Sequence, residues 1–297
     1  MADVSTMFQE GISMVRGAVS NVSVEQFGFI KAFVRLCNDG WLQGFHERNG
    51  GNLTYRMTPT EVSMCRSFFN EGSSAWVSLG VQANNLCGEY FLTTGAGVYL
   101  RNVGLDPVAM VGIVEINAAG DAMRTVWGFK NGGRPTSEFP SHYLCHAARK
   151  AATKDRCRVV YHAHPTNAIA LSFAAPLDAR TISRILWRSM PECIMVFPHG
   201  IGVVPFMVPG SIELAQASAA LMETYDAVLW AQHGLLCSGS DFDDAFGLMH
   251  TIEKSAEIHA RACALVEKDG FRQTITDSDL RAIAASLHLS VNESFLD

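Results

Sequence analysis

The segment from Arg158 to His164 constrains the fold more than any other part of the chain. Val159 to Tyr161 is an apolar run that leads into an alternating His-Ala-His pattern, which predicts a buried strand. Side chains repeat every two residues along a strand, so His162 and His164 share one face. Pro165 cannot continue a central strand. We therefore expect the pair at the end of a strand, where two imidazoles can converge on one ion.

A third histidine, His233, ends a second apolar run that begins at Ala227. Imidazole is a favoured zinc ligand, and three protein ligands leave one coordination position open, as in catalytic zinc sites. For the pair at 162 and 164, spacing alone leaves two interpretations about equally open: a metal site, and ordinary histidines of the core. The other histidines lack such spacing and are expected to be structural or on the surface: His46, His142, His146, His250 and His259.

Further runs of aromatic and β-branched residues predict additional strands, several of them antiparallel because the gaps between them are short. Apolar residues at helical spacing predict helices between these runs, which indicates a layered α/β domain rather than a strict βαβ alternation. The predicted strands are Tyr90 to Thr94, Gly112 to Ile116, Thr125 to Phe129, Arg158 to His164, Ile194 to Phe197, Gly202 to Phe206 and Ala227 to His233. The predicted helices are Phe27 to Cys37, with a capping box at Ser23 and Gln26, Pro135 to Arg149, Thr181 to Trp187, Ile212 to Glu223 and Asp241 to Glu267.

Glu138 is the candidate catalytic base. Thr136 or Ser137 is expected to cap the helix that begins near Pro135, which places Glu138 in its first turn. A metal that polarises a carbonyl acidifies the adjacent C–H group, so a nearby carboxylate can remove the proton. Glutamate is also common in a first helical turn because the helix dipole favours negative charge there. Spacing alone leaves both interpretations open.

Two glycine-rich turns are candidates for binding a phosphate group. Asn49-Gly50-Gly51-Asn52 and Thr94-Gly95-Ala96-Gly97 offer backbone N–H groups together with amide or hydroxyl donors. Neither turn matches a Walker or dinucleotide-binding pattern. Glycine and asparagine also form ordinary turns readily, and that interpretation stays open for each turn by itself.

Composition limits the classes of protein that this chain can belong to. Its 297 residues are 48% hydrophobic and 18% charged, which allows a large core and argues against disorder. No repeat or linker-like stretch marks a boundary, so we expect a single domain over residues 1–297, with residues 1–40 as an N-terminal helical segment. The net charge of −6 and the absence of Lys/Arg runs argue against binding nucleic acid or a membrane.

The eight cysteines are scattered and form no C-x-x-C pair, which disfavours a thiolate zinc site or a disulfide framework. The first residues contain charges and no apolar signal-peptide core. We therefore expect a cytoplasmic location.

Taken together, five motifs resemble the class II aldolase/adducin family in both order and spacing. The resemblance extends from about Trp41 to about Ile275. It implies an α/β/α domain with a central mixed, largely antiparallel sheet. The five motifs are Glu47 to Thr54, Thr94-Gly95-Ala96-Gly97, Pro135-Thr136-Ser137-Glu138, His162-Ala163-His164 and Gln232-His233-Gly234.

The resemblance implies reversible cleavage of L-rhamnulose 1-phosphate to dihydroxyacetone phosphate and L-lactaldehyde, a step of L-rhamnose degradation. It implies one Zn²⁺ per subunit on His162, His164 and His233, with Glu138 exchanging the proton of the enediolate carbon. Glu192 matches a family acid that protonates the aldehyde oxygen from a neighbouring subunit of a homotetramer. The residues implied to surround the phosphate are Asn49, Gly51, Asn52, Gly97, Thr136 and Ser137.

One position departs from the pattern of related aldolases, in which a serine hydroxyl usually contacts the phosphate. This chain has Ala96 there, so one donor is missing unless a backbone N–H replaces it. The exact sugar specificity therefore stays open, and the alternatives are a fuculose-phosphate type of aldolase and a sugar-phosphate 4-epimerase. A non-catalytic adducin-like assembly module is a third alternative, although such modules lose metal ligands that this chain keeps.

Overall fold

The computed structural model describes residues 23–70, 72, 74–266 and 270–297. Residues 1–22 of the predicted N-terminal helical segment 1–40 lie outside the described residues. The described part contains a nine-stranded sheet in the order β2-β5-β4-β3-β1-β6-β9-β8-β7, in which only β7 and β8 pair in parallel. The strands are β1 (Asn52–Arg56), β2 (Val77–Ser78), β3 (Tyr90–Thr94), β4 (Val111–Ile116), β5 (Ala122–Gly128), β6 (Val159–Ala163), β7 (Gly202–Val204), β8 (Ala227–Trp230) and β9 (Gly234–Gly239).

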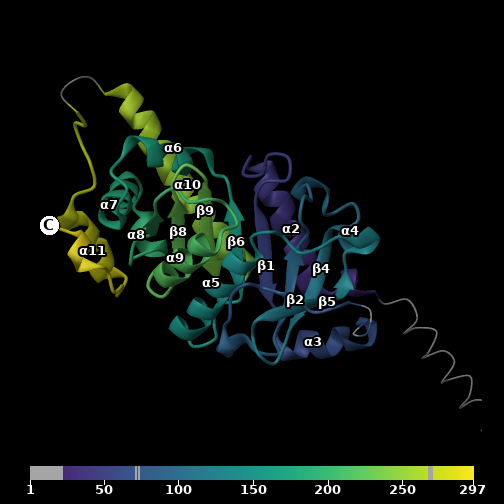
Figure 1. Ribbon diagram of the computed structural model, residues 1–297. Helices are drawn as coiled ribbons and strands as arrows, with labels where there is room; N and C mark the ends of the chain where they lie inside the picture. The colour runs from purple at the N-terminus through teal and green to yellow at the C-terminus, as the bar shows by residue number, and fades with distance from the viewer. Residues whose placement is uncertain (1–22, 71, 73, 267–269) are drawn as a thin grey trace, which may run out of the picture.

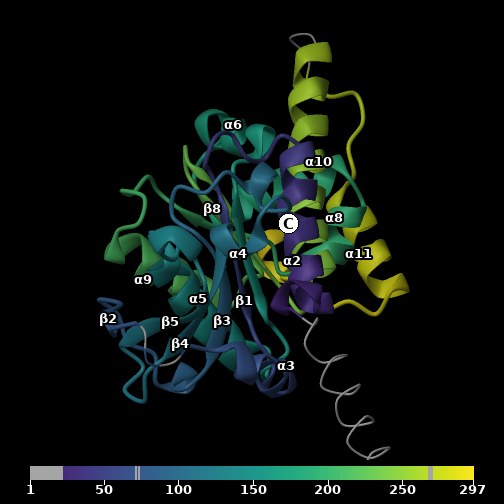
Figure 2. The same cartoon turned by 90° about the vertical axis from the view of Figure 1, so that its right-hand side faces the viewer.

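Helices cover both faces of this sheet, which confirms the layered α/β/α class and the largely antiparallel sheet. The helices are α2 (Gly28–Leu42), α3 (Pro59–Cys65), α4 (Pro107–Met110), α5 (Phe139–Ala152), α6 (Thr166–Ala174), α7 (Ala179–Ser189), α8 (Glu192–Val196), α9 (Ile212–Met222), α10 (Phe242–Leu265) and α11 (Asp277–Ser286). Figure 2 shows α2 beside α10 on one face, with α5 and α9 on the other. Figure 1 shows β6 near the middle of the molecule, between the strands of the N-terminal half and those of the C-terminal half.

The alternation predicted for β6 is present in the structure. Val159, Tyr161 and Ala163 join the main core cluster, which also contains the buried sides of α2 and α10. Val160 faces the opposite cluster, which contains Cys145 of α5 and residues of α9. His162 shares the face of Val160, and it pairs with Asn52 of β1 and Leu236 of β9. His162, near the end of the strand, therefore lies on the face that α5 covers.

One predicted strand is wrong. The segment from Ile194 to Phe197 lies mostly in α8, a helix that follows Pro191 as its N-cap. A short apolar run does not distinguish a buried strand from one buried side of a helix. Pro191 and Glu192 ahead of the run favour a helix start, because proline is tolerated there and the helix dipole favours negative charge in the first turn.

Two predicted helix caps are also wrong. The segment from Val24 to Gln26 forms a 3₁₀ turn without a side-chain cap from Ser23, and α2 begins only at Gly28. The N-cap of α5 is Glu138 rather than Thr136 or Ser137. The backbone N–H of Thr136 instead bonds to the carbonyl of Thr94, at 3.0 Å, because this segment extends the sheet edge before the helix begins.

Strands β1, β2 and β9 and helices α3, α4, α6 and α11 were not predicted. β1 carries the polar residues Asn52, Thr54 and Arg56 in a fully buried strand, which hides the usual alternation. All eight cysteines are unpaired thiols, as expected from their scatter. In the described part of the chain, no helix is long and apolar enough to cross a membrane.

Candidate metal and phosphate site

The three predicted histidines converge at one end of the sheet. His162 is the next-to-last residue of the buried strand β6, and His164 directly follows the strand. His233 lies in the turn between β8 and β9. One ring nitrogen from each lies within 4.8 Å of the other two, a spacing that fits a single metal ion. The structure thus brings together residues that lie 69 to 71 positions apart in the sequence.

Hydrogen bonds fix the orientation of two of the rings. Nδ1 of His162 bonds to the carbonyl of Leu235 at 3.1 Å, and Nδ1 of His164 bonds to the Glu47 carboxylate at 2.8 Å. Partners of this kind orient metal-binding histidines and leave Nε2 as the ligand atom. Nε2 of His162 is buried and has no hydrogen-bond partner among the described residues. A buried nitrogen left without a partner is what a metal ligand needs, so the donor set fits zinc.

Burial also keeps these rings in the protonation state that a metal requires. Burial, followed by the positive charge that His164 and His233 would carry, lowers the pKa of His162 well below its ordinary value. The same two causes, burial and the neighbouring His164, lower the pKa of His233 to about 4. Both imidazoles are therefore neutral at physiological pH, with lone pairs available for a metal ion.

The turn that carries His233 is held in an uncommon conformation. Gln232 has a φ of +59°, in the left-handed region, and its backbone N–H and side chain both bond to Ser172. Gly234 follows because a Cβ there would lie 2.5 Å from the carbonyl oxygen of Ala163 and 2.7 Å from a ring carbon of His162. The Gln-His-Gly motif is therefore required by the packing of the turn against β6.

Glu138 points at the histidines from the start of α5. Its carboxylate lies 3.6 Å from Nε2 of His162 and 3.8 Å from Nε2 of His233. Burial raises the pKa of Glu138, and this effect outweighs the hydrogen bond that Asn52 donates to the carboxylate at 2.7 Å. A buried carboxylate with a raised pKa beside a metal site has the properties of a general base.

The two glycine turns meet next to this group. Gly51 has a φ of +76°, and a Cβ there would lie 2.4 Å from His46, so only glycine fits at this turn. A bridge between Gly95 and Pro135 joins the second turn to the segment before α5. The resulting cavity, of about 170 Å³, is lined by the three histidines, Glu138 and all six predicted phosphate residues, which are Asn49, Gly51, Asn52, Gly97, Thr136 and Ser137.

Glu192 lies outside this cavity. It is exposed at the start of α8 and is not among the residues that line the site within one chain. The single chain therefore neither assembles Glu192 into the site nor tests its predicted role at the site of a neighbouring subunit.

Three further histidines lie near the site: His46, His142 and His146. They were expected to be structural or on the surface, and all three are buried. His46 bonds through Nδ1 to the carbonyl of Gly50, at 3.1 Å, and so supports the first glycine turn. His142 and His146 are four residues apart on α5, which places them on one helix face. That spacing was a usable signal. Glu47 begins the first of the five motifs, but nothing in the sequence indicated its contact with His164.

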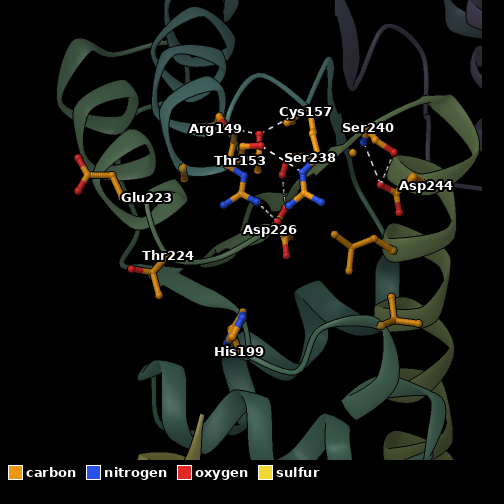
Figure 3. A pocket seen from close by; sticks show the side chains of 15 residues that line it. Arg149, Thr153, Cys157, His199, Glu223, Thr224, Asp226, Ser238, Ser240 and Asp244 are labelled. Carbon is orange, nitrogen blue, oxygen red and sulfur yellow. Dashed lines mark hydrogen bonds and ion pairs between the residues drawn. The ribbon is translucent and has the colours of Figure 1, made fainter. Parts of the chain in front are cut away.

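A wider hollow of about 610 Å³ lies at the other end of the same strands (Figure 3). Its most buried cation, Arg149, is paired with Asp226 and bonds to the carbonyl of Met222 at 3.0 Å. His199 faces the hollow alone, away from the Arg149 and Asp226 pair. None of the predicted site residues lines this hollow. This hollow is larger than the cavity at the histidines, but it contains none of the residues predicted to bind a metal or a phosphate or to transfer a proton.

Most of the chain is similar to a known protein family. Residues 31–260 match the class II aldolase and adducin N-terminal domain. The rhamnulose-1-phosphate aldolase of Enterobacter sp. (strain 638) is 38% identical over 269 residues, which cover 91% of this chain and 96% of that protein. The rhamnulose-1-phosphate aldolase of Salmonella choleraesuis (strain SC-B67) is 40% identical over 255 residues, or 86% of this chain and 91% of that protein.

Solved structures agree with this placement. A sugar-phosphate aldolase from Thermotoga maritima is 28% identical, with a TM-score of 0.66 over 80% of this chain and 95% of that one. An L-fuculose 1-phosphate aldolase has a TM-score of 0.56 at 20% identity, over 87% of this chain and 95% of that one, and is similar in fold alone.

Proposed function

The chain belongs to the class II aldolase and adducin family, and from that membership we propose that it is a zinc-dependent aldolase acting on L-rhamnulose 1-phosphate. The reaction is reversible cleavage to dihydroxyacetone phosphate and L-lactaldehyde. Relatives named for this substrate align with nearly the whole chain, which supports the substrate. The observation that carries the chemistry is the buried Glu138 carboxylate, 3.6 Å from the unpartnered Nε2 of His162.

His162, His164 and His233 would hold one zinc ion per subunit. Zinc bound there supplies a Lewis acid that polarises the carbonyl of dihydroxyacetone phosphate and acidifies the neighbouring C–H bonds. The bonds to Leu235 and Glu47 keep the rings of His162 and His164 turned toward the cavity. The neutral state of the buried rings preserves the ligand set at physiological pH.

Glu138 is assigned the proton transfer. Asn52 holds Oε2 by a hydrogen bond of 2.7 Å, whereas Oε1 is the oxygen nearer to His233, at 3.8 Å from its Nε2. In the synthetic direction Glu138 removes a proton from the hydroxymethyl carbon of dihydroxyacetone phosphate, and the resulting enediolate carbon attacks the aldehyde. In cleavage the same carboxyl returns the proton to that carbon. Burial raises the pKa of this group and so makes the carboxylate a stronger base.

The phosphate is assigned to the glycine turns. The backbone N–H groups of Gly51, Gly97 and Ser137 have no hydrogen-bond partner among the described residues, although all three residues line the cavity. Unpaired N–H groups at such turns are suited to phosphate oxygens, and side chains of Asn49 and Thr136 would add donors. The backbone N–H of Ala96 instead bonds to the carbonyl of Arg134 at 2.8 Å, so it does not replace the missing serine hydroxyl.

The remaining assignments extend the proposal beyond the single chain. Exposed Glu192 would act at the site of a neighbouring subunit in a homotetramer, where it would protonate the aldehyde oxygen. Its position on a short helix outside the cavity is consistent with a role in a second subunit. A cytoplasmic location and one domain over residues 1–297 complete the proposal.

The substrate is tested by incubating the purified protein with dihydroxyacetone phosphate and L-lactaldehyde and analysing the products by NMR. We expect L-rhamnulose 1-phosphate as the main product. The stereoisomer L-fuculose 1-phosphate as the main product would replace the proposed specificity, and epimerisation of a pentulose phosphate without aldol product would replace the reaction type.

The metal is tested by the zinc content of His233→Ala, with His259→Ala as the matched control. We expect His233→Ala to lose both zinc and turnover, whereas His259, which among the described residues contacts Cys263 and the ring of Phe271 and does not line the cavity, is expected to be dispensable. Full activity in a metal-free His233→Ala protein would overturn the site. A wild-type protein that binds no zinc would instead favour a non-catalytic assembly module.

A further inference from the structure

A chain of hydrogen bonds runs from Glu138 away from the cavity and into the protein interior. Nδ2 of Asn52 donates to Oε2 of Glu138 at 2.7 Å, and Oδ1 of Asn52 bonds to Nε2 of His142. Nδ1 of His142 lies 2.8 Å from the hydroxyl of Thr54, which lies 2.9 Å from Nε2 of His146. Neither imidazole lies among the metal-ligand candidates, so the mechanism above leaves both unused.

The donors and acceptors along this chain can be assigned from one end to the other. An ionised carboxylate only accepts hydrogen bonds, so Asn52 turns its NH₂ group toward Glu138 and its oxygen toward His142. Nε2 of His142 must then carry the hydrogen, and Nδ1 must accept from the hydroxyl of Thr54. The Thr54 oxygen accepts in turn from Nε2 of His146. The Thr54 hydroxyl also lies 3.5 Å from the carbonyl of Val160, but Nδ1 of His142 is the nearer acceptor at 2.8 Å. The roles therefore agree from Glu138 to Thr54, and His146 only adds a donor beyond the end of this path.

The environment of the chain preserves these roles. Asn52, Thr54, His142 and His146 are all buried, and both histidines have 1% or less of their surface exposed. Burial lowers the pKa of His142 to about 3 and that of His146 well below its ordinary value, so both rings stay neutral. A neutral ring has one donor and one acceptor nitrogen, and the Asn52 oxygen, which can only accept, requires Nε2 of His142 to be the donor.

The orientation of Asn52 has a direct consequence for the base. An asparagine amide can rotate by half a turn, which would place its oxygen against the Glu138 carboxylate and replace attraction by repulsion. The Nε2–H group of His142 is a hydrogen-bond donor, so it favours only the orientation in which the Asn52 oxygen faces it. His142 also lies one helical turn after Glu138, with its backbone N–H bonded to the Glu138 carbonyl at 3.2 Å. The base and the group behind its partner are therefore carried by the same helix.

We propose that His142 is a positioning residue for the proton-transfer step: it orients the amide of Asn52 and thereby holds the Glu138 carboxylate toward the substrate carbon. Thr54 supports this role because its hydroxyl donates to Nδ1 of His142 and holds the ring in place. The proposal rests on the assignment of Glu138 as the base. The proposal adds a residue, His142, that contacts neither the proposed metal ion nor the substrate.

The test compares His142→Leu, His142→Gln and His146→Leu. Leucine removes the donor to Asn52, whereas the glutamine amide nitrogen reaches about the same place as imidazole Nε2. His146→Leu is the matched control, because it removes an equally buried histidine of the same helix that does not contact Asn52. The readouts are bound zinc, melting temperature, and exchange of the dihydroxyacetone phosphate hydroxymethyl protons with D₂O, together with kcat and KM.

We expect His142→Leu to keep its zinc and to lose about tenfold to a hundredfold in proton exchange and kcat, because small displacements of a reacting group have effects of that size. The KM is expected to change much less than kcat. His142→Gln should recover most of the lost rate, and His146→Leu should keep the wild-type exchange rate even where it lowers the melting temperature.

Wild-type exchange in His142→Leu would overturn the proposal, as would an equal loss in His146→Leu. If His142→Leu does not fold, Thr54→Val and Thr54→Ser test the same chain, and equal exchange rates in these two variants would overturn it. A wild-type protein that exchanges no proton would instead refute the proposed function, so the two failures are distinguishable.

Discussion

Glu253 of α10 connects this helix to the segment that carries two of the proposed metal ligands. Its side chain is buried, and its carboxylate accepts three hydrogen bonds at the start of α6. The donors are the backbone N–H of Asn167 at 3.0 Å, the Asn167 side chain at 2.7 Å and the backbone N–H of Ala168 at 2.9 Å. α6 begins two residues after His164, so this carboxylate fixes the chain directly beyond a ligand.

Glu253→Ala leaves two backbone N–H groups of a helix start without their acceptor. Hydrogen bonds to a charged group contribute about 1.5 to 3 kcal/mol each, which sums to at least about 4 kcal/mol for three. Removing the buried charge recovers part of its desolvation cost, so we expect a net loss of about 3 kcal/mol. At an unfolding entropy of about 2.1 cal/mol/K per residue, this loss corresponds to a decrease of about 5 °C in the melting temperature of the 297-residue chain.

The assay is thermal unfolding of the zinc-loaded protein, with Glu257→Ala as the control on the same helix. Glu257 pairs with Lys254 and Arg261 at the surface, and such pairs contribute little, so its melting temperature should stay close to that of the wild type. We also expect Glu253→Ala to release zinc at a lower chelator concentration. Equal melting temperatures of the two variants would refute the reasoning.

Three further predictions follow from other contacts. Gly234→Ala would place a Cβ 2.7 Å from a ring carbon of His162, so we expect less zinc per subunit by mass spectrometry, and full occupancy would contradict the packing argument. Burial alone would raise the pKa of Asp277, but bonds from the Asp297 N–H and two arginines lower it from 3.8 to about 2. The charged form therefore stabilises the fold by about 2 kcal/mol above pH 4, and this contribution is lost as the pH falls toward 2. Denaturant unfolding should show Asp277→Asn less stable at pH 7 and the gap closing in acid, and a pH-independent gap would contradict the assignment. Ala96→Ser supplies the missing hydroxyl, so the KM for dihydroxyacetone phosphate should fall by about tenfold, and an unchanged KM would mean that the phosphate lies elsewhere.

The convergence of His162 and His164 could be predicted because it depends on short-range geometry. Alternation along β6 placed His162 on one face, and Pro165 marked the end of the strand. His233 could be connected to this pair only through the resemblance of the motifs, since a contact across about 70 residues leaves no periodic signal. The layered class followed from the mixture of strand and helix periodicities, whereas the central strand β1 escaped because its buried residues are partly polar.

The surroundings of the site could not be predicted in the same way. Thr136 resembles a helix cap in sequence, but a long-range bond to Thr94 holds it at the sheet edge. The segment from Ile194 to Phe197 satisfies strand and helix patterns alike, and tertiary packing decides between them. The i, i+4 spacing of His142 and His146 indicates a shared helix face, but the contact of His142 with Asn52, which lies 90 residues earlier, leaves no local signal. Such contacts depend on the folded structure rather than on local preference.

The central claim is that Glu138 moves a proton at a carbon activated by zinc on the three histidines. The most direct measurement is exchange of the hydroxymethyl protons of dihydroxyacetone phosphate with D₂O, without aldehyde, for the wild type and Glu138→Gln at equal zinc content. We predict rapid stereospecific exchange by the wild type and a loss of at least about a hundredfold in the variant. Equal exchange by the two zinc-loaded proteins would contradict the account.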